Sequence, residues 1–155
     1  MFVIHVKKIK RRFVAAAAGT AALAAVVFLL VGCLGGGKTV QPQTVPAATN
    51  DERVAWLTEL GWEVIPEPLE TLVLQLPEDL AQSHSDYIVL QEKLGLPLAD
   101  YGGKTVSRYT YAVNNYPGYT GPVQADLYVC DDLVIGGDII AAGENGFVRE
   151  LVFPK

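Results

Sequence analysis

The residue types that could carry out hydrolysis gather in one short segment, Ser83-His84-Ser85-Asp86. His84 is the only histidine outside the N-terminal tail. Neighbouring positions on one helix point in different directions, so these groups cannot form the nucleophile–base–acid line that such catalysis requires. A single imidazole with no second ligand also makes no metal site. We therefore predict no catalytic residue, no bound metal and no cofactor.

Three other features could bind or react. Cys130 has no His or Cys pattern beside it, so we expect a passive strand residue rather than a reactive thiol. Four acidic residues near one predicted hairpin could attract Ca²⁺, but their spacing does not match an EF-hand loop: Asp126, Asp131, Asp132 and Asp138. We expect Arg108 to pair with one of the many acids or to stack on a tyrosine.

The charge distribution separates the N-terminus from the rest of the chain. The 155 residues carry a formal net charge of −5, and five basic residues lie before Phe13. Without these five, seven basic residues face seventeen acidic ones, which gives a net charge of −10. An acidic domain with no basic run does not attract phosphate backbones, so we expect no nucleic-acid partner.

Residues 13–34 form an uncharged, apolar stretch of 22 residues. As a helix it would reach about 33 Å, which is enough to cross a hydrocarbon core of roughly 30 Å. The basic residues precede it, and only Lys38 follows within the next fifteen positions. The positive-inside bias therefore predicts a basic cytoplasmic tail at 1–12, a transmembrane anchor at 13–34 and residues 35–155 outside the cytoplasm. The predicted localisation is the cell membrane, crossed once.

A lipoprotein is the alternative to an uncleaved anchor. Leu30-Val31-Gly32-Cys33 resembles a bacterial lipobox, in which the cysteine is lipidated and becomes the mature N-terminus. Cys33 could equally be one more small, buried residue of a membrane helix. A cleaved secretory signal fits less well, because its apolar region normally spans about 7 to 15 residues. Both remaining readings tether the domain to the outside of the same membrane.

After the anchor, residues 35–49 are rich in Gly, Pro and polar residues and predict a flexible linker. Residues 50–155 predict one α+β domain with helices near 51–60 and 78–94 and a strand near 69–76. Four strands follow at 104–114, 123–130, 133–142 and 147–153, and their short connections favour an antiparallel meander. We expect two helices packed on a sheet of about four to five strands.

The alternation within these strands assigns their faces. We expect five side chains to line the core beneath the helices: Tyr109, Tyr111, Val113, Leu127 and Val129. The same alternation places Gln124, Asp126 and Tyr128 on a helix-free face. Gly136-Gly137 sits inside a strand pattern and predicts a β-bulge or close backbone packing.

Several motifs resemble one bacterial family. They are Tyr101-Gly-Gly-Lys104, Arg108-Tyr-Thr-Tyr111, Asn115-Tyr-Pro117 and Val134-Ile-Gly-Gly-Asp138, together with a Met-Phe-Val opening before a membrane segment. In these the chain resembles the domain of unknown function (DUF) 4830 family over most of residues 50–153. The family comprises small, N-terminally anchored proteins of Clostridia-type bacteria. The resemblance implies an envelope protein and supplies no activity.

The predicted meander brings two loops to one end of the sheet, those at 114–122 and 143–146. Six residues would then share one pole: Asn114, Asn115, Tyr116, Tyr119, Glu144 and Asn145. Tyr and Asn combine apolar area with hydrogen bonds at modest entropic cost, which suits a binding surface. They could equally cover the sheet edge and serve the turns.

These observations favour a membrane-tethered extracytoplasmic binding or interaction module over an enzyme. Its partner would be an unidentified envelope protein or a small ligand, besides the membrane that residues 13–34 enter. Two alternatives remain open: an envelope hydrolase, and a regulatory partner of a membrane complex. The latter would act through small residues of the anchor such as Gly19 and Ala24, which permit close helix packing.

Overall fold

The computed structural model of the chain describes residues 42–143 and 145–154. The predicted basic tail, the transmembrane anchor, the lipidation candidate Cys33, the first part of the predicted linker and Glu144 lie outside the described residues. Within the described part of the chain, none of the helices has the length and apolar character needed to span a bilayer.

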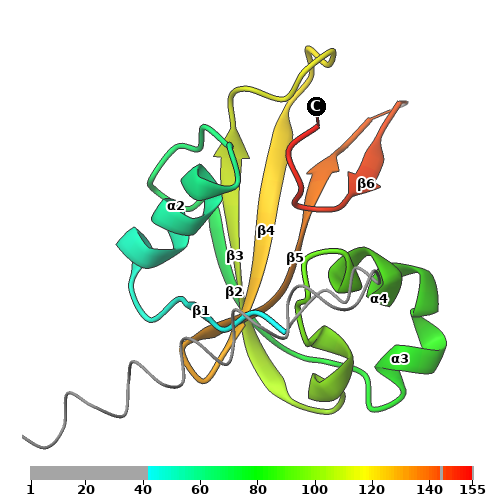
Figure 1. Cartoon of the computed structure of the whole chain (residues 1–155). Helices are drawn as coiled ribbons and strands as arrows, with labels where there is room; N and C mark the ends of the chain where they lie inside the picture. Colours follow the sequence, from blue (N-terminus) through cyan, green and yellow to red (C-terminus); the bar gives the residue numbers. More distant parts are fainter. Residues whose placement is uncertain (1–41, 144, 155) are drawn as a thin grey trace, which may run out of the picture. The chain divides into compact units, whose positions relative to one another are not determined.

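The domain is α+β, with a six-stranded antiparallel sheet and short helices (Figure 1). Its elements in chain order are β1 (Val45–Pro46), α2 (Asn50–Glu59), β2 (Glu70–Gln75), α3 (Leu80–Ser83), α4 (Ser85–Glu92), the 3₁₀ helix η1 (Leu98–Tyr101), β3 (Thr105–Val113), β4 (Val123–Cys130), β5 (Leu133–Ala141) and β6 (Phe147–Arg149).

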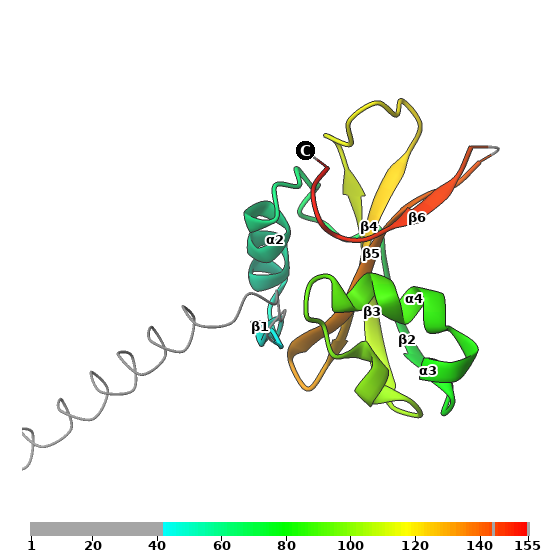
Figure 2. The same cartoon turned by 45° about the vertical axis from the view of Figure 1, so that its right-hand side comes forward.

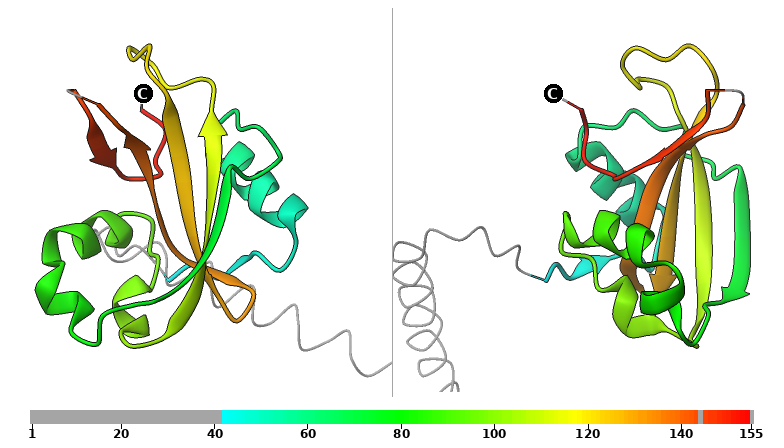
Figure 3. Two further views of the ribbon diagram at one scale, coloured as in Figure 1. Left: turned by 180° about the vertical axis from the view of Figure 1, so that it is seen from behind. Right: turned by 90° about the vertical axis from the view of Figure 1, so that its right-hand side faces the viewer.

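The strand order is β1-β5-β4-β3-β2, and β6 also pairs with β5. The predicted meander from β3 to β6 is confirmed, and so is the pairing of the 69–76 region with its first strand. The β3–β4 loop and the β5–β6 hairpin leave the sheet at the same end (Figure 2). β2 is the outermost strand on the β3 side (Figure 3).

The first helix forms where its capping signals predict it. The Thr49 side chain accepts from the Glu52 N–H, while the Glu52 side chain accepts from the Thr49 N–H, which completes a capping box. The helix ends before Gly61, whose φ of +99° suits a residue without a Cβ. Its buried face carries Trp56 and Leu57.

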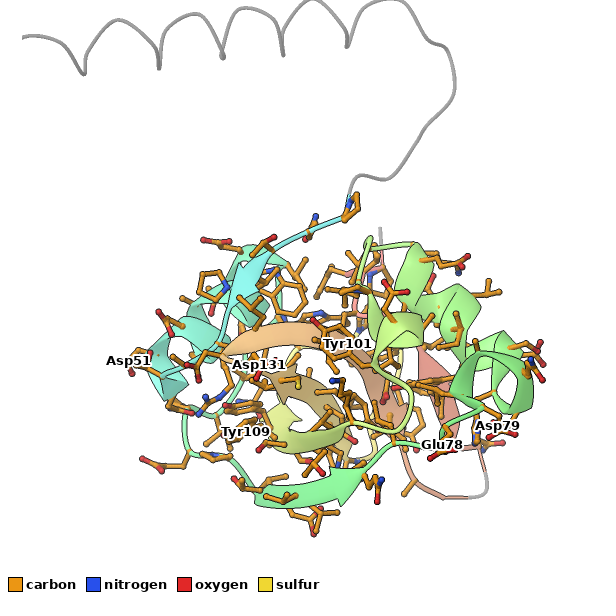
Figure 4. All side chains as sticks on the ribbon, turned by 90° about the horizontal axis from the view of Figure 1, so that it is seen from below. Asp51, Glu78, Asp79, Tyr101, Tyr109 and Asp131 are labelled. Carbon is orange, nitrogen blue, oxygen red and sulfur yellow. The ribbon has the colours of Figure 1, made fainter. Side chains whose placement is uncertain are left out.

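The two helical regions lie on opposite faces of the sheet, so the prediction of one helix-covered face is wrong (Figure 4). Helix α2 packs in the core that contains Tyr111 and Leu127, and the predicted inward residues of β3 and β4 do line this core. Helices α3, α4 and η1 pack in a second core against Val106 and Ile135, which face the other way. The strand alternation was read correctly, but it does not specify which helix covers which face.

The predicted second helix is divided at His84, which separates α3 from α4 with φ −131° and ψ 38°. Serines on either side of His84 have weak helix propensity because their hydroxyls compete for backbone groups. The Ser83 hydroxyl donates to the Asp79 carbonyl at 3.0 Å and also lies 2.8 Å from His84 Nδ1. The hydrolase-like residue types therefore form a helix break on the surface.

The folded part begins before Asn50, within the segment that was predicted to be linker. Val45 and Pro46 pair with Val134 and Leu133 of β5, and the Ala47 N–H donates to the Asp132 carbonyl. Val45 and Ala47 are buried. A two-residue strand is too short to show a period of two in the sequence, and Pro46 argues against a strand except at an edge. β1 does lie at an edge of the sheet, where it pairs only with β5.

Close packing at Gly136-Gly137 is confirmed. A Cβ on Gly137 would stand 2.5 Å from the Asp126 carbonyl oxygen and from Leu151 Cδ1, and a Cβ on Gly136 would meet Leu98 at 3.1 Å. The β4–β5 register also shifts opposite Tyr128 and Val129, which marks a bulge beside the glycines.

Replacing Leu127 by Asp should largely unfold the domain. Leu127 is fully buried at 0% exposure, and an unpaired carboxylate there would cost several kcal/mol out of a total stability of about 5–15 kcal/mol. Val89→Asp, at a position 54% exposed on α4, is the control and should melt cooperatively near the wild-type temperature. Circular dichroism melting distinguishes the two, and a near-wild-type melt of Leu127→Asp would contradict the assigned inward face.

Candidate functional site

The pole predicted from the meander exists for those of its residues that the structure describes. Val113, Val123, Ala141 and Phe147 lie side by side in four adjacent strands, so the loops that follow or precede them meet at one end (Figure 2). The sheet thus brings the 114–122 loop and the β5–β6 turn together. Glu144 of this turn lies outside the described residues.

An aromatic cluster holds the pole together: Trp62, Tyr116, Tyr119, Phe147 and Phe153. The ring of Tyr116 stacks on Trp62 at 5.9 Å between centroids and lies 4.8 Å from Phe147, which Tyr119 meets edge-on at 5.3 Å. Each such pair contributes about 0.5–1.5 kcal/mol beyond the area it buries. The Trp62 indole N–H donates to the Leu151 carbonyl at 2.7 Å, which also fixes the C-terminal segment. The two predicted tyrosines therefore have a structural role.

The predicted asparagines divide into two kinds. Asn115 is structural: its amide oxygen accepts from the Glu63 N–H and its NH₂ group donates to the Gly61 carbonyl, each at 2.9 Å. Asn114 and Asn145 are exposed, and within the described residues their side chains make no hydrogen bond. These two amides are the groups of the prediction that remain available to a ligand.

A surface cavity of about 280 Å³ adjoins the aromatic cluster, lined by Tyr116, Arg149, Glu150, Val152 and Pro154. Glu150 is paired with Lys93 at 2.8 Å, which holds the pKa of its carboxyl below the ordinary value. The Arg149 guanidinium lies 5.7 Å from the Phe147 ring centroid and donates only to the Val148 carbonyl among the described residues. The cavity therefore combines an aromatic ring with the Arg149 guanidinium, which forms no close ion pair in the described part of the chain. The Glu150 carboxylate lines the same cavity, and the charge of Arg149 contributes to its lowered pKa. Arg149 is not among the residues predicted for the pole, because it lies in β6 rather than in either of the two loops.

The face of the sheet that α4 covers holds a polar cluster, on the side that was predicted to be free of helices. Asp126 of β4 and Asp138 of β5 are direct cross-strand partners, and both are buried. Thr110 donates to Asp126, and Tyr87 of α4 donates to Asp138. Arg108 pairs with Glu70, and its Nε stands 3.8 Å from Asp126 Oδ2, an ion-pair distance too long for a hydrogen bond.

The two buried carboxyls of this cluster hold their protons more tightly than exposed ones do. Burial raises the pKa of the Asp138 carboxyl to about 6, partly opposed by the hydrogen bond from Tyr87, and burial also raises the pKa of Asp126. The expectation that Arg108 would pair with an acid is confirmed. The four aspartates do not gather: Asp131 (labelled in Figure 4) and Asp132 form the β4–β5 turn, away from Asp126 and Asp138. No group of three or more potential metal ligands occurs in the described part of the chain.

The remaining reactive candidates stay apart. His84 lies exposed at the α3–α4 break, while Cys130 at the end of β4 makes a weak 3.8 Å contact with the Thr105 carbonyl. Burial raises the pKa of the Cys130 thiol, helped by Asp131, so at neutral pH it is protonated and a poor nucleophile.

Comparison with protein-family models, with curated proteins and with solved structures gives no match. The likeness to the DUF 4830 family therefore rests on the motifs quoted above.

The raised pKa of Asp138 predicts a defined pH dependence of stability. A carboxyl that binds its proton more tightly when folded stabilises the fold below its unfolded pKa near 3.9, and this contribution is lost as pH rises through about 6. Asp138→Asn removes the titration and still offers an acceptor to Tyr87. As pH rises from 4 to 7.5, the wild type should lose this contribution and the variant should not. The difference in the free energy of unfolding, variant minus wild type, should therefore grow by about 2–3 kcal/mol over this range.

Urea denaturation across this pH range measures the difference. Asp100→Asn, at an exposed position of η1, is the matched control and should run parallel to wild type. Parallel profiles for Asp138→Asn and wild type would show that Asp138 titrates normally.

Proposed function

We propose that the chain is a membrane-tethered extracytoplasmic binding module of a bacterial envelope, and that its pole is the binding surface. The observation that carries the proposal is the cavity beside the aromatic cluster, where Arg149 and Tyr116 face a common space. A guanidinium next to an aromatic ring suits a ligand that carries a carboxylate or another anionic group on an apolar body. The exposed amides of Asn114 and Asn145 add hydrogen-bonding groups at the rim.

The rigidity of the pole supports a binding role. The loop at 114–122 would be a mobile connection if it stood alone, but Tyr116 and Tyr119 anchor it to β6 and Trp62. A surface that is ordered before binding loses less conformational entropy on binding. Loops held by a rigid sheet are also where recognition sites usually occur.

The membrane tether rests on the sequence. Residues 13–34 would anchor the module with residues 35–155 outside, or Cys33 would carry a lipid in the alternative reading. The resemblance to the DUF 4830 family agrees with either form. The hydrolase alternative has no supporting constellation among the described residues. The His84 ring lies within hydrogen-bond distance of Ser83, whereas the Cys130 thiol lies beside Asp131 and the Thr105 carbonyl, far from any histidine of the described part. The alternative of a regulatory partner acts through the anchor, and exchanging residues 13–34 for an unrelated anchor would test it.

The first expected outcome concerns topology. Protease added to intact spheroplasts should remove residues 35–155, because the basic residues lie before the apolar stretch. A cytoplasmic marker protein is the control for intact cells. Full protection of the domain would show that it lies in the cytoplasm and would contradict the predicted orientation. Mass spectrometry of the N-terminus then separates the anchors: a lipid-modified Cys33 terminus identifies the lipoprotein, and an intact N-terminus the helix.

The second expected outcome concerns the pole. A photoreactive amino acid at Asn145 should give a discrete crosslinked product in the native envelope, whereas one at Glu78, beside α3, should not. Arg149→Gln removes the charge and keeps a polar side chain that can donate hydrogen bonds, so it should lower the yield of this product at least several-fold. Lys104→Gln removes the same charge from an exposed site at the start of β3, at the other end of that strand from the pole, and should have no effect.

Arg149→Gln is preferable to removing the tyrosines, because alanine at Tyr116 and Tyr119 would dismantle the aromatic cluster. Equal crosslinking by Arg149→Gln and wild type would show that Arg149 and its cavity do not take part in binding. Equal labelling from Asn145 and Glu78 would remove the pole altogether.

A further inference from the structure

The outer edge of β2 has few of the features that normally protect an edge strand, and Glu70 is its one charged residue. Its sequence, Glu-Thr-Leu-Val-Leu-Gln, contains no Pro, Gly or Lys. Large apolar side chains are exposed along it and just before it: Leu69 is 56% exposed, Leu72 41% and Val73 66%. Exposed, apolar edge strands are sites of pairing with another strand, and natural proteins usually block them with charges, prolines or bulges. β2 is thus built to be covered (Figure 3).

The hydrogen-bond pattern shows which backbone groups are available. The Leu76 N–H donates to the Lys104 carbonyl, and on the same side of β3 the carbonyls of Thr110 and Ala112 accept from residues before β2. Even-numbered residues of β2 therefore bond to β3, and alternation turns the N–H and C=O groups of Thr71, Val73 and Gln75 outward. These three residues face the free edge.

This edge is complementary to itself. If two copies pair antiparallel about a two-fold axis at Val73, this residue meets the partner's Val73, and Thr71 meets the partner's Gln75. All three outward residues then form hydrogen-bonded pairs, with about six backbone hydrogen bonds in total. On the other face Leu72 comes to lie opposite the partner's Leu74, an apolar cross-strand pair.

The charges favour a second copy as the occupant. Glu70 is the only charged residue of β2, and Arg108 of its own chain already pairs with it. In the register centred on Val73, Glu70 lies opposite the partner's Leu76 and away from the partner's Glu70. No like charges therefore stand opposite each other in the new pair of strands.

We propose that β2 is a self-association edge through which two copies of this chain pair antiparallel about Val73, joining their sheets. The pairing is independent of the pole, since it uses the β3-side edge rather than the ends of the strands. The acidic character of the chain opposes association at long range, so added salt should strengthen the pairing by screening this repulsion.

Disulfide trapping in the full chain tests both the pairing and its register. With Cys33 and Cys130 replaced by Ala, Val73→Cys places two thiols at directly opposed positions, with Cα atoms about 5.5 Å apart, within reach of a disulfide. Oxidation of the chain in its membrane should give a covalent dimer. Thr71→Cys is the matched control, because its two copies would lie about 14 Å apart along the strands and cannot bridge. The double variant Thr71→Cys, Gln75→Cys should crosslink again.

A second variant separates pairing from folding. The Val73 N–H points away from β3, so Val73→Pro leaves the intrachain ladder intact and removes an outward donor. This variant should keep the wild-type circular dichroism spectrum and lose dimers in light scattering of the detergent-solubilised chain, whereas Val89→Pro, in α4, is expected to perturb the fold. Equal crosslinking by Val73→Cys and Thr71→Cys, or none by either, would overturn the proposal. Crosslinking of Val73→Cys to a different protein would replace the second copy by that partner.

Discussion

The outer edge of β5 is the constraint on which the described domain depends. β4 pairs with β5 along one edge. On the outer edge of β5 the backbone groups have three separate partners: β1 near the start of the strand, β6 near its end and, between them, a side chain. Gln91 of α4, only 1% exposed, accepts from the Gly137 N–H through its amide oxygen at 2.8 Å. A buried N–H without a partner would cost about 1–3 kcal/mol, so this one hydrogen bond holds α4 against the gap between two short strands.

The positions of the buried polar cluster and of the pole both follow from the way this edge is closed. Docking of α4 brings Tyr87 onto Asp138, which makes the buried polar cluster, and the Lys93–Glu150 pair ties the end of α4 to the segment after β6. β6 in turn carries Phe147 into the aromatic cluster of the pole. Asp138 therefore lies in the same strand, β5, that pairs with β6 at the pole. The two regions are linked through β5, rather than through any direct contact between them.

Local sequence signals predicted the strands of the domain well and its layers poorly. The meander could be predicted because short connections leave adjacent strands few other pairings, and α2 because its cap and its stop are both local. The faces were harder. Asp126 and Tyr128 alternate with apolar residues and read as solvent-facing, but α4 and its neighbours cover that side. Alternation distinguishes two faces without showing that both are buried, and β1 is too short to produce any pattern.

At the candidate site the arrangement of the loops could be predicted from the sequence, whereas the contacts of their side chains could not. Topology alone brought the 114–122 loop and the β5–β6 turn to one pole, yet it could not show that Tyr116 would be enclosed by Trp62 and Phe147, which lie far away in the sequence. Most of the aromatic area at the pole is packed against other rings of the domain, so in the proposed binding role the groups at its rim, above all Arg149, would contact the ligand. Such a surface gains affinity through preorganisation more than through area. The proposed pairing at the β2 edge differs from binding at the pole. Backbone groups of β2 could form hydrogen bonds with any strand, so only the register of the side chains can make the pairing selective.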